Sequence, residues 1–243
     1  MKKIPETNAI FENVSAAKKL SGENTNCLRI SIDTKAKVKV GEFSREGYDR
    51  NSQPLTALDH DYEPESILVP FGILDVVKDQ LWIYFGKSRE TSDFIVDCLE
   101  MWWEENSQKD KPLEELMIEL DGGSSIRSNR TQFIKRMVDF SRRSQLKIRL
   151  VYYPPYHSKY NTIERCWACL ENFWNGAILD SVEKTVEWAK NMTWKGVKPI
   201  VKIVEQTYET GIKPSSTELA ECQKFWHPSE TLPSWDVTII PTG

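Results

Sequence analysis

The sequence predicts an α/β fold in which a mixed sheet is flanked by helices. Strand-like segments with apolar residues come first, with no helical pattern between them, so these early strands are expected to pair antiparallel. From residue 91 onward, helix-like and strand-like segments alternate along the chain. That alternation is typical of a sheet covered by helices.

Five segments are expected to form strands. In the first and the fourth, apolar residues alternate, and an aspartate, Asp33 or Asp121, closes the strand on the opposite face. Gly122 and Gly123 then end the fourth strand. The third segment is wholly apolar, which favours a central position in the sheet. The five segments are 27–33, 38–43, 81–85, 116–121 and 148–152.

Helical spacing of apolar residues predicts the helices. The clearest is 161–174, where apolar side chains form one stripe and Glu164 flanks it, so its carboxylate can reach past the core edge toward the sheet. Gly176 is a suitable stop for this helix. The other helical segments are expected from residue 91 to 103, and at 130–143, 181–192 and 197–209.

Three parts are expected along the chain. Residues 1–26 are mostly polar and are interpreted as the remnant of an upstream region or as a short helix. Residues 27–176 form the main domain, with a loop-rich excursion at 44–80, where prolines and glycines interrupt the pattern. Residues 177–243 are expected to form a C-terminal helical extension.

Composition indicates an ordinary packed protein. The chain has 243 residues, 40% of them hydrophobic and 28% charged. It contains neither a membrane-spanning apolar run nor a secretory signal. The five scattered cysteines fit reduced thiols in a cytoplasm better than disulfides. The net charge of −4 argues weakly against a nucleic-acid partner, although a local basic patch and bound divalent cations can override it.

Asp33, Asp121 and Glu164 are the candidate catalytic residues and metal ligands. Magnesium prefers oxygen ligands, and two such ions about 3.5–4 Å apart can activate an attacking oxygen and stabilise a leaving one. Carboxylates converging from two strand ends and a helix suit that task. The alternative is structural, because an aspartate between a strand and a glycine is more often a turn residue. Spacing alone favours that alternative.

A resemblance strengthens the catalytic interpretation. The segments Arg29–Ala36, Ile118–Gly123 and Tyr152–Arg165 resemble the three carboxylate motifs of DDE-type insertion-sequence transposases. The third is the most specific, with Pro154-Pro155 followed by Ser158, Asn161 and Glu164. The chain is most similar to the ISAzo group, from about residue 27 to about 213. Its members also resemble the short segments Asp59–Asp61, Pro70–Ile73 and Thr91–Phe94.

The resemblance implies a ribonuclease H-like fold with the first aspartate on its central strand. It also implies metal-dependent cleavage and strand transfer on double-stranded DNA, with magnesium as the cofactor and manganese as a substitute. Water frees a 3′-hydroxyl at the element's end, and that hydroxyl attacks target DNA. Asp33 would bridge both ions, while Asp121 and Glu164 would each hold one. A homo-oligomer in the bacterial cytoplasm is expected.

The chain departs from the family pattern in three places. Gly122–Ile126 stands where the family usually has Asn-Gly-Pro-Glu-Asn, and Thr162 stands where proline is common. Only 32 residues precede Asp33, whereas the family usually has a helix-turn-helix region there. We therefore expect a shortened protein or an isolated domain, and a catalytically silent DNA-binding or oligomerising remnant is the alternative function. A third is a nuclease of the same fold acting on RNA–DNA hybrids or Holliday junctions.

Basic residues cluster between the second aspartate and the last of the five expected strands, and two more flank the glutamate. They are candidates for contacts with the DNA backbone, and a solvated helix face is an equally good interpretation. The candidates are Arg127, Arg130, Arg142, Arg143, Lys159 and Arg165. Cys166 and Cys169 have zinc-ligand spacing, but core packing is favoured because no second pair follows. His60 and His157 are interpreted as structural or loop residues.

Overall fold

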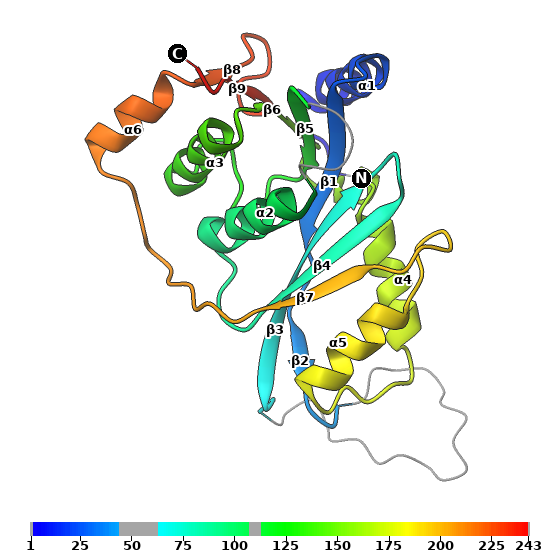
Figure 1. Ribbon diagram of the computed structural model, residues 1–243. Helices are drawn as coiled ribbons and strands as arrows, with labels where there is room; N and C mark the ends of the chain where they lie inside the picture. The colour runs from blue at the N-terminus through cyan, green and yellow to red at the C-terminus, as the bar shows by residue number, and fades with distance from the viewer. Residues whose placement is uncertain (1, 44–62, 107–112, 243) are drawn as a thin grey trace.

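The computed structural model describes residues 2–43, 63–106 and 113–242. Nine strands form one sheet: β1 Cys27–Thr34, β2 Val38–Val40, β3 Ser66–Asp75, β4 Gln80–Gly86, β5 Glu115–Leu120, β6 Lys147–Tyr152, β7 Ile200–Val204, β8 Trp226–Pro228 and β9 Asp236–Ile239. Their order is β7-β4-β3-β1-β5-β6-β9-β8, and β2 pairs with β3 off this path (Figure 1).

The pairing confirms the predicted mixed sheet. β3 is antiparallel to both β1 and β4, whereas β1, β5 and β6 run parallel to one another. Parallel neighbours end at the same edge of a sheet, so the residues that follow β1 and β5 are brought together. The two predicted strand-end aspartates belong to these two strands.

Helices cover both faces of the sheet (Figure 1). Their bounds are α1 Thr7–Glu23, α2 Ser92–Asn106, α3 Thr131–Ser144, α4 Glu164–Trp174, α5 Val182–Asn191 and α6 Ser216–Gln223, with a 3-10 turn η1 at Ser158–Tyr160. The core on one face joins α2 and α3 to β1, β5 and β6. On the other face, α4 and α5 pack on β3 and β4, and α1 packs over β5 and β6. No described helix is long and apolar enough to cross a membrane.

β3 corrects the expected loop at 44–80, of which residues 44–62 lie outside the described part of the chain. Pro70 and Gly72 suggested a break, but the strand accommodates both. Its first residues pair with β2 and residues 71–75 pair with β1, so Pro70 falls between these two ladders. A missing backbone N–H is tolerated where no ladder bond is interrupted on that side. The side chains of Ile163 and Trp167 fill the space beside Gly72 that a side chain at this position would occupy.

β7 corrects the helix expected at 197–209. β-branched residues dominate the sequence Ile200-Val201-Lys202-Ile203-Val204, and this segment pairs in parallel with β4. β8 and β9 likewise extend the other edge of the sheet beyond β6. The described part of residues 177–243 therefore contains three strands beside α5 and α6, and at 200–204 backbone pairing outweighs local helical spacing. The expected division of the chain at residues 26 and 176 stays a prediction.

α1 confirms the short helix that was one of two interpretations of residues 1–26. The fully buried side chain of Glu119 on β5 links α1 to the sheet. Lys18 on α1 approaches this carboxylate at 3.0 Å, Arg29 on β1 at 3.3 Å, and the Tyr153 hydroxyl donates to it at 2.7 Å. A buried charge needs such partners to offset its lost hydration.

Candidate active site

Asp33 lies on the face of β1 that turns toward α4. Ile30 and Ile32 point into the core beneath α2 and α3, so Ser31 and Asp33 point to the opposite face. The Asp33 residue is only 7% exposed. Its carboxylate therefore lies at the boundary between the core and the sheet edge.

The segment before α4 is fastened to the same strand. The Ser31 hydroxyl donates to Asn161 Oδ1 at 2.5 Å, and Asn161 Nδ2 donates to the carbonyl oxygen of Ile32 at 2.9 Å. The backbone N–H of Ile163 donates to Ser31 Oγ at 3.1 Å. Ser31 and Asn161 are fully buried, so these bonds are protected from water. They fix the residue that follows, Glu164, relative to Asp33.

Trp167 makes the direct link between α4 and the first aspartate. Its indole Nε1 donates to Asp33 Oδ2 at 2.9 Å. Gly72 on β3, which lies opposite Asp33 in the strand pair, makes room for this contact. A Cβ atom at Gly72 would lie 2.7 Å from both the Trp167 ring and Ile163 Cδ1. Trp167 belongs to the apolar stripe of the helix expected at 161–174, and its bond to Asp33 was not predicted.

Glu164 and Asp121 approach from the two neighbouring elements. The expected helix at 161–174 begins at Glu164, so this side chain lies in the first turn and is partly buried. Asp121 directly follows β5, and its Oδ1 accepts a hydrogen bond from the backbone N–H of Gly123 at 2.9 Å. Since β5 is parallel to β1, both aspartates lie at one edge of the sheet.

The electrostatics show that Asp33 lies within the influence of the other two carboxylates. Burial, followed by the negative charges of Asp121 and Glu164, raises the pKa of Asp33 from 3.8 to about 8. The hydrogen bond from Trp167 acts in the opposite direction, because it stabilises the ionised form. A cation at this edge would relieve the repulsion.

The donor set fits magnesium or manganese, which prefer carboxylate oxygens. Among the described residues, no three His, Cys, Asp or Glu side chains are close enough together to hold one ion. If two ions were bound, Asp33 with Asp121 would hold one and Asp33 with Glu164 would hold the other. The mutual repulsion around Asp33 is consistent with those pairs.

Three of the predicted DNA-binding residues lie near this edge. Arg127 is exposed on the loop after β5, and its Nε donates to the carbonyl oxygen of Gly122 at 3.1 Å. Lys159 is exposed in η1 above the Tyr160 ring, and Arg165 is exposed directly after Glu164. Arg130 is partly buried at the start of α3, the end of that helix nearest the loop.

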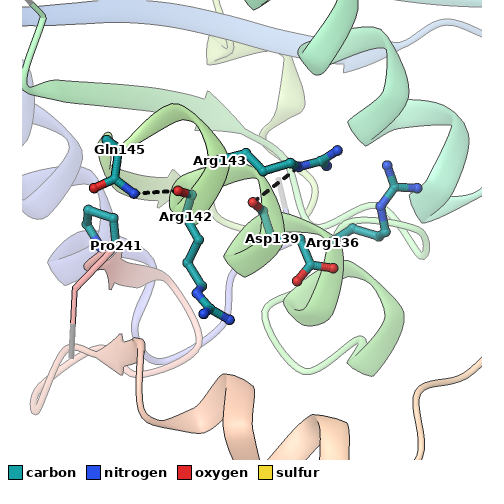
Figure 2. A pocket seen from close by; sticks show the side chains of 6 residues that line it. All are labelled: Arg136, Asp139, Arg142, Arg143, Gln145 and Pro241. Carbon is teal, nitrogen blue, oxygen red and sulfur yellow. Dashed lines mark hydrogen bonds between the residues drawn. The ribbon is translucent and has the colours of Figure 1, made fainter.

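Arg142 and Arg143 lie at the far end of α3, about 18 Å along the helix from its start. They line a shallow cavity of about 680 Å³ together with Arg136, Asp139, Gln145 and Pro241 (Figure 2). Arg142 stacks on Phe225, and Arg143 pairs with Glu100 on α2. The structure therefore does not bring these two arginines together with the carboxylates.

The remaining candidates take structural positions. His157 is buried, and its Nδ1 lies 2.7 Å from the carbonyl oxygen of Pro155, which confirms the loop interpretation. Cys166 and Cys169 are free thiols, and burial raises the pKa of Cys166 to about 12, as expected for core packing. His60 and the Asp59–Asp61 segment lie outside the described residues.

Comparison with known proteins gives one family. Residues 1–241 match the family described as the Rhodopirellula transposase DDE domain. No curated protein matches the sequence.

Two solved complexes of Mos1 transposase share the fold of this chain. The Mos1 mariner paired end complex with Mn superposes with a TM-score of 0.53 at 10% identity, over 77% of this chain and 55% of that one. The Mos1 strand transfer complex gives 0.52 at 11% identity, over 77% and 54%. The HTLV-2 integrase catalytic core domain in complex with magnesium gives 0.40 at 13% identity, over 70% and 92%. The chain thus spans little more than half of the Mos1 chains, and the predicted ribonuclease H-like fold is confirmed.

Proposed function

The chain belongs to the DDE transposase family, and from that premise we propose that it cuts and joins DNA strands through Asp33, Asp121 and Glu164. The observation that supports this assignment is that Asp121, after β5, and Glu164, at the start of α4, lie near enough to Asp33 on β1 for their charges to act on it. Burial, followed by the negative charges of Asp121 and Glu164, raises the pKa of Asp33, and a bound cation would favour its ionised form. The reaction is cleavage at the element's ends followed by strand transfer to target DNA.

Magnesium is the proposed cofactor, and manganese can replace it. Asp33 would hold both ions, with Asp121 completing one site and Glu164 the other. The ions supply positive charge that activates the attacking oxygen and stabilises the leaving oxygen at phosphorus. The Mos1 mariner paired end complex, which shares the fold of this chain, is a complex with Mn, and this supports a divalent metal here.

The chain's own residues position these ligands. Trp167 fixes the Oδ2 atom of Asp33. Ser31 and Asn161 hold the start of α4 against β1, which sets the place of Glu164. Such prearrangement matters because a ligand displaced by about 1 Å can cost a hundredfold in rate.

Double-stranded DNA is the proposed substrate, both as element ends and as target. The Mos1 neighbours are a paired end complex and a strand transfer complex, which supports this choice. Arg127, Arg130, Lys159 and Arg165 are proposed to contact phosphates beside the carboxylates. Cutting two ends and joining them to one target favours a homo-oligomer. Free cysteines favour the reducing cytoplasm of a bacterium as the place of action.

The test is cleavage of labelled duplex DNA containing the element's own ends, with Mg²⁺, Mn²⁺ or neither. The parent chain is expected to cut only with metal. Asp33→Asn, Asp121→Asn and Glu164→Gln should each lower the rate by at least about a hundredfold, because each removes a charged ligand.

Asp75→Asn is the matched control. Asp75 is also a buried aspartate at a strand end, but it accepts bonds from the backbone N–H groups of Val77 and Lys78 in a turn. It should cut like the parent. If the three carboxylate variants also cut like the parent, the site assignment is wrong. A folded parent that never cuts with either metal would favour the catalytically silent alternative.

A further inference from the structure

A second feature of the sheet edge is a pocket beside the loop that follows Asp121. Its volume is about 280 Å³. The loop after β5, the end of β6 and the turn before β9 contribute to its wall. The lining includes Gly122, Arg127, Asn129, Tyr152, Pro155 and Trp235.

The pocket is directly connected to the proposed catalytic edge. Gly122 follows Asp121 in the chain, and a Cβ atom at Gly122 would lie 4.0 Å from the Trp235 ring. The bond from Arg127 Nε to the Gly122 carbonyl oxygen holds this guanidinium over the same loop. A molecule in the pocket would therefore lie next to any DNA strand held at Asp121.

The turn that carries Trp235 is held firmly. Ser128 Oγ donates to the Ser234 carbonyl oxygen at 2.9 Å, which joins the loop after β5 to this turn. The backbone N–H of Tyr152 donates to the Trp235 carbonyl oxygen at 2.9 Å, which joins the turn to β6. The walls of the pocket are therefore already in place in the protein.

The lining has the chemistry of a nucleobase site. Trp235, Tyr152 and Pro155 offer flat apolar surfaces, and the Tyr152 hydroxyl is already used in a bond to Ile126. Arg127 and Asn129 are exposed at the rim. A guanidinium can hold a phosphate, an amide can bond to the edge of a base, and an aromatic ring can stack on any base.

We propose that this pocket binds one unstacked nucleobase of the DNA strand held at Asp121, with Trp235 as the stacking residue and Arg127 on the adjacent phosphate. The inference rests on the proposed function, since it requires DNA at this edge. A base removed from its helix leaves a neighbouring phosphate more accessible. The pocket would thus help to orient the strand, separately from the carboxylates.

The test compares two labelled duplexes that differ by one unpaired thymidine. Their dissociation constants are measured by fluorescence anisotropy with the full chain in metal-free buffer, so that the DNA is not cut. The duplex with the unpaired base should bind about tenfold more tightly, the preference expected from one base–aromatic stack. Trp235→Leu should reduce that preference to about onefold, and Trp235→Phe should keep most of it, because a ring remains.

Trp103→Phe is the control, because Trp103 is a partly buried tryptophan on α2 that does not line the pocket. It should leave the preference unchanged. The ratio is measured on one protein preparation, so a partial loss of folded protein cancels. In addition, 5-iododeoxyuridine at the unpaired position should photocrosslink to Trp235.

The outcomes separate the two proposals. If the paired duplex binds but the unpaired base adds nothing, or if Trp235→Leu keeps the preference, the pocket proposal is overturned and the DNA proposal stands. If neither duplex binds, both are overturned. A crosslink that maps elsewhere in the chain also overturns the assignment of the pocket.

Discussion

The indole N–H of Trp167 donates to Asp33 Oδ2 at 2.9 Å, so the helix that begins with Glu164 is tied to the strand that presents Asp33. Both groups are nearly excluded from water, with 4% and 7% exposure respectively. When Asp33 is ionised, such a hydrogen bond to its charged carboxylate is worth about 1.5–3 kcal/mol. One contact therefore contributes to stability and also sets the properties of a proposed metal ligand.

Trp167→Phe should shift the pH profile of metal-dependent cleavage to higher pH. In the parent, the hydrogen bond from Trp167 stabilises the ionised carboxylate of Asp33. Removal of this bond therefore raises the pKa of Asp33 further. The acidic limb is expected to move upward by about one pH unit, equivalent to about 1.4 kcal/mol. Cleavage rates measured with Mn²⁺ across the pH range give the shift.

Trp188→Phe is the control for that shift. Trp188 on α5 packs against the Phe173 ring on α4, whereas the indole that bonds to Asp33 is that of Trp167. Its profile should match that of the parent. An unchanged acidic limb in Trp167→Phe would show that the bond does not tune Asp33.

Gly72→Ala should destabilise the protein and impair cleavage together. The added Cβ would lie 2.7 Å from Trp167 and Ile163, so α4 must move away from the sheet. Overpacking of this kind typically costs about 1–3 kcal/mol. Urea unfolding gives the loss in free energy of unfolding, and cleavage assays below the transition give the loss in rate.

Gly22→Ala provides the contrast within the same chain. Gly22 lies in α1, and a Cβ there meets nothing within 4 Å. It should leave stability unchanged or raise it by up to about 1 kcal/mol, since alanine favours a helix. Equal behaviour of the two variants would mean that α4 has more freedom than its contacts indicate.

The metal-free protein should lose stability as the pH rises from about 4 to about 8. The pKa of Asp33 is about 8 in the folded chain and 3.8 ordinarily, so between these values the folded state keeps a proton that the unfolded state releases. Each pH unit in this window then costs the folded state about 1.4 kcal/mol through this group.

Asp33→Asn lacks this ionisation, so its melting temperature should change less across the same window. Saturating Mg²⁺ at pH 8 should raise the melting temperature of the parent and have little effect on the variant. Parallel pH curves for the two proteins would contradict the assignment of the shifted pKa to Asp33.

The basic residues should divide into two functional groups. Arg136 on α3 pairs with Asp93, Asp97 and Glu100 on α2, so Arg136→Ala should lower the free energy of unfolding by about 2 kcal/mol without changing DNA affinity. Arg165→Ala should leave stability unchanged and reduce the salt dependence of DNA binding by about one phosphate contact. Thermal melts and anisotropy titrations at several salt concentrations separate the two effects.

Much of the fold could be predicted because its strongest signals are local. Alternating apolar residues located β1, β5 and β6, and helical stripes located α2, α3 and α4. β3 and β7 could not be located in this way. Pro70 is tolerated only because two different partner strands meet there, and β7 is a strand because β4 lies beside it. Both facts concern distant segments, which local patterns do not report.

The candidate site likewise has residues that the sequence could predict and residues that it could not. Asp33 and Asp121 were recognisable as strand ends, and Glu164 was recognisable from the motif around it. The residues that support them were not predicted as a group. Ser31, Asn161 and Gly72 act through spatial contacts, and a buried serine or a glycine in a strand has no single meaning in sequence. A polar residue at every second position of β1, Ser31 then Asp33, was the available signal.

Some strands of the sheet are synthesised long before the strands that pair with them. β6 leaves the ribosome long before its partner β9, and β4 waits for β7. Until those late strands emerge, the nascent chain presents two open backbone edges, which invite pairing with other chains. Slow production at low temperature, or chaperone coexpression, should therefore improve the yield of this protein.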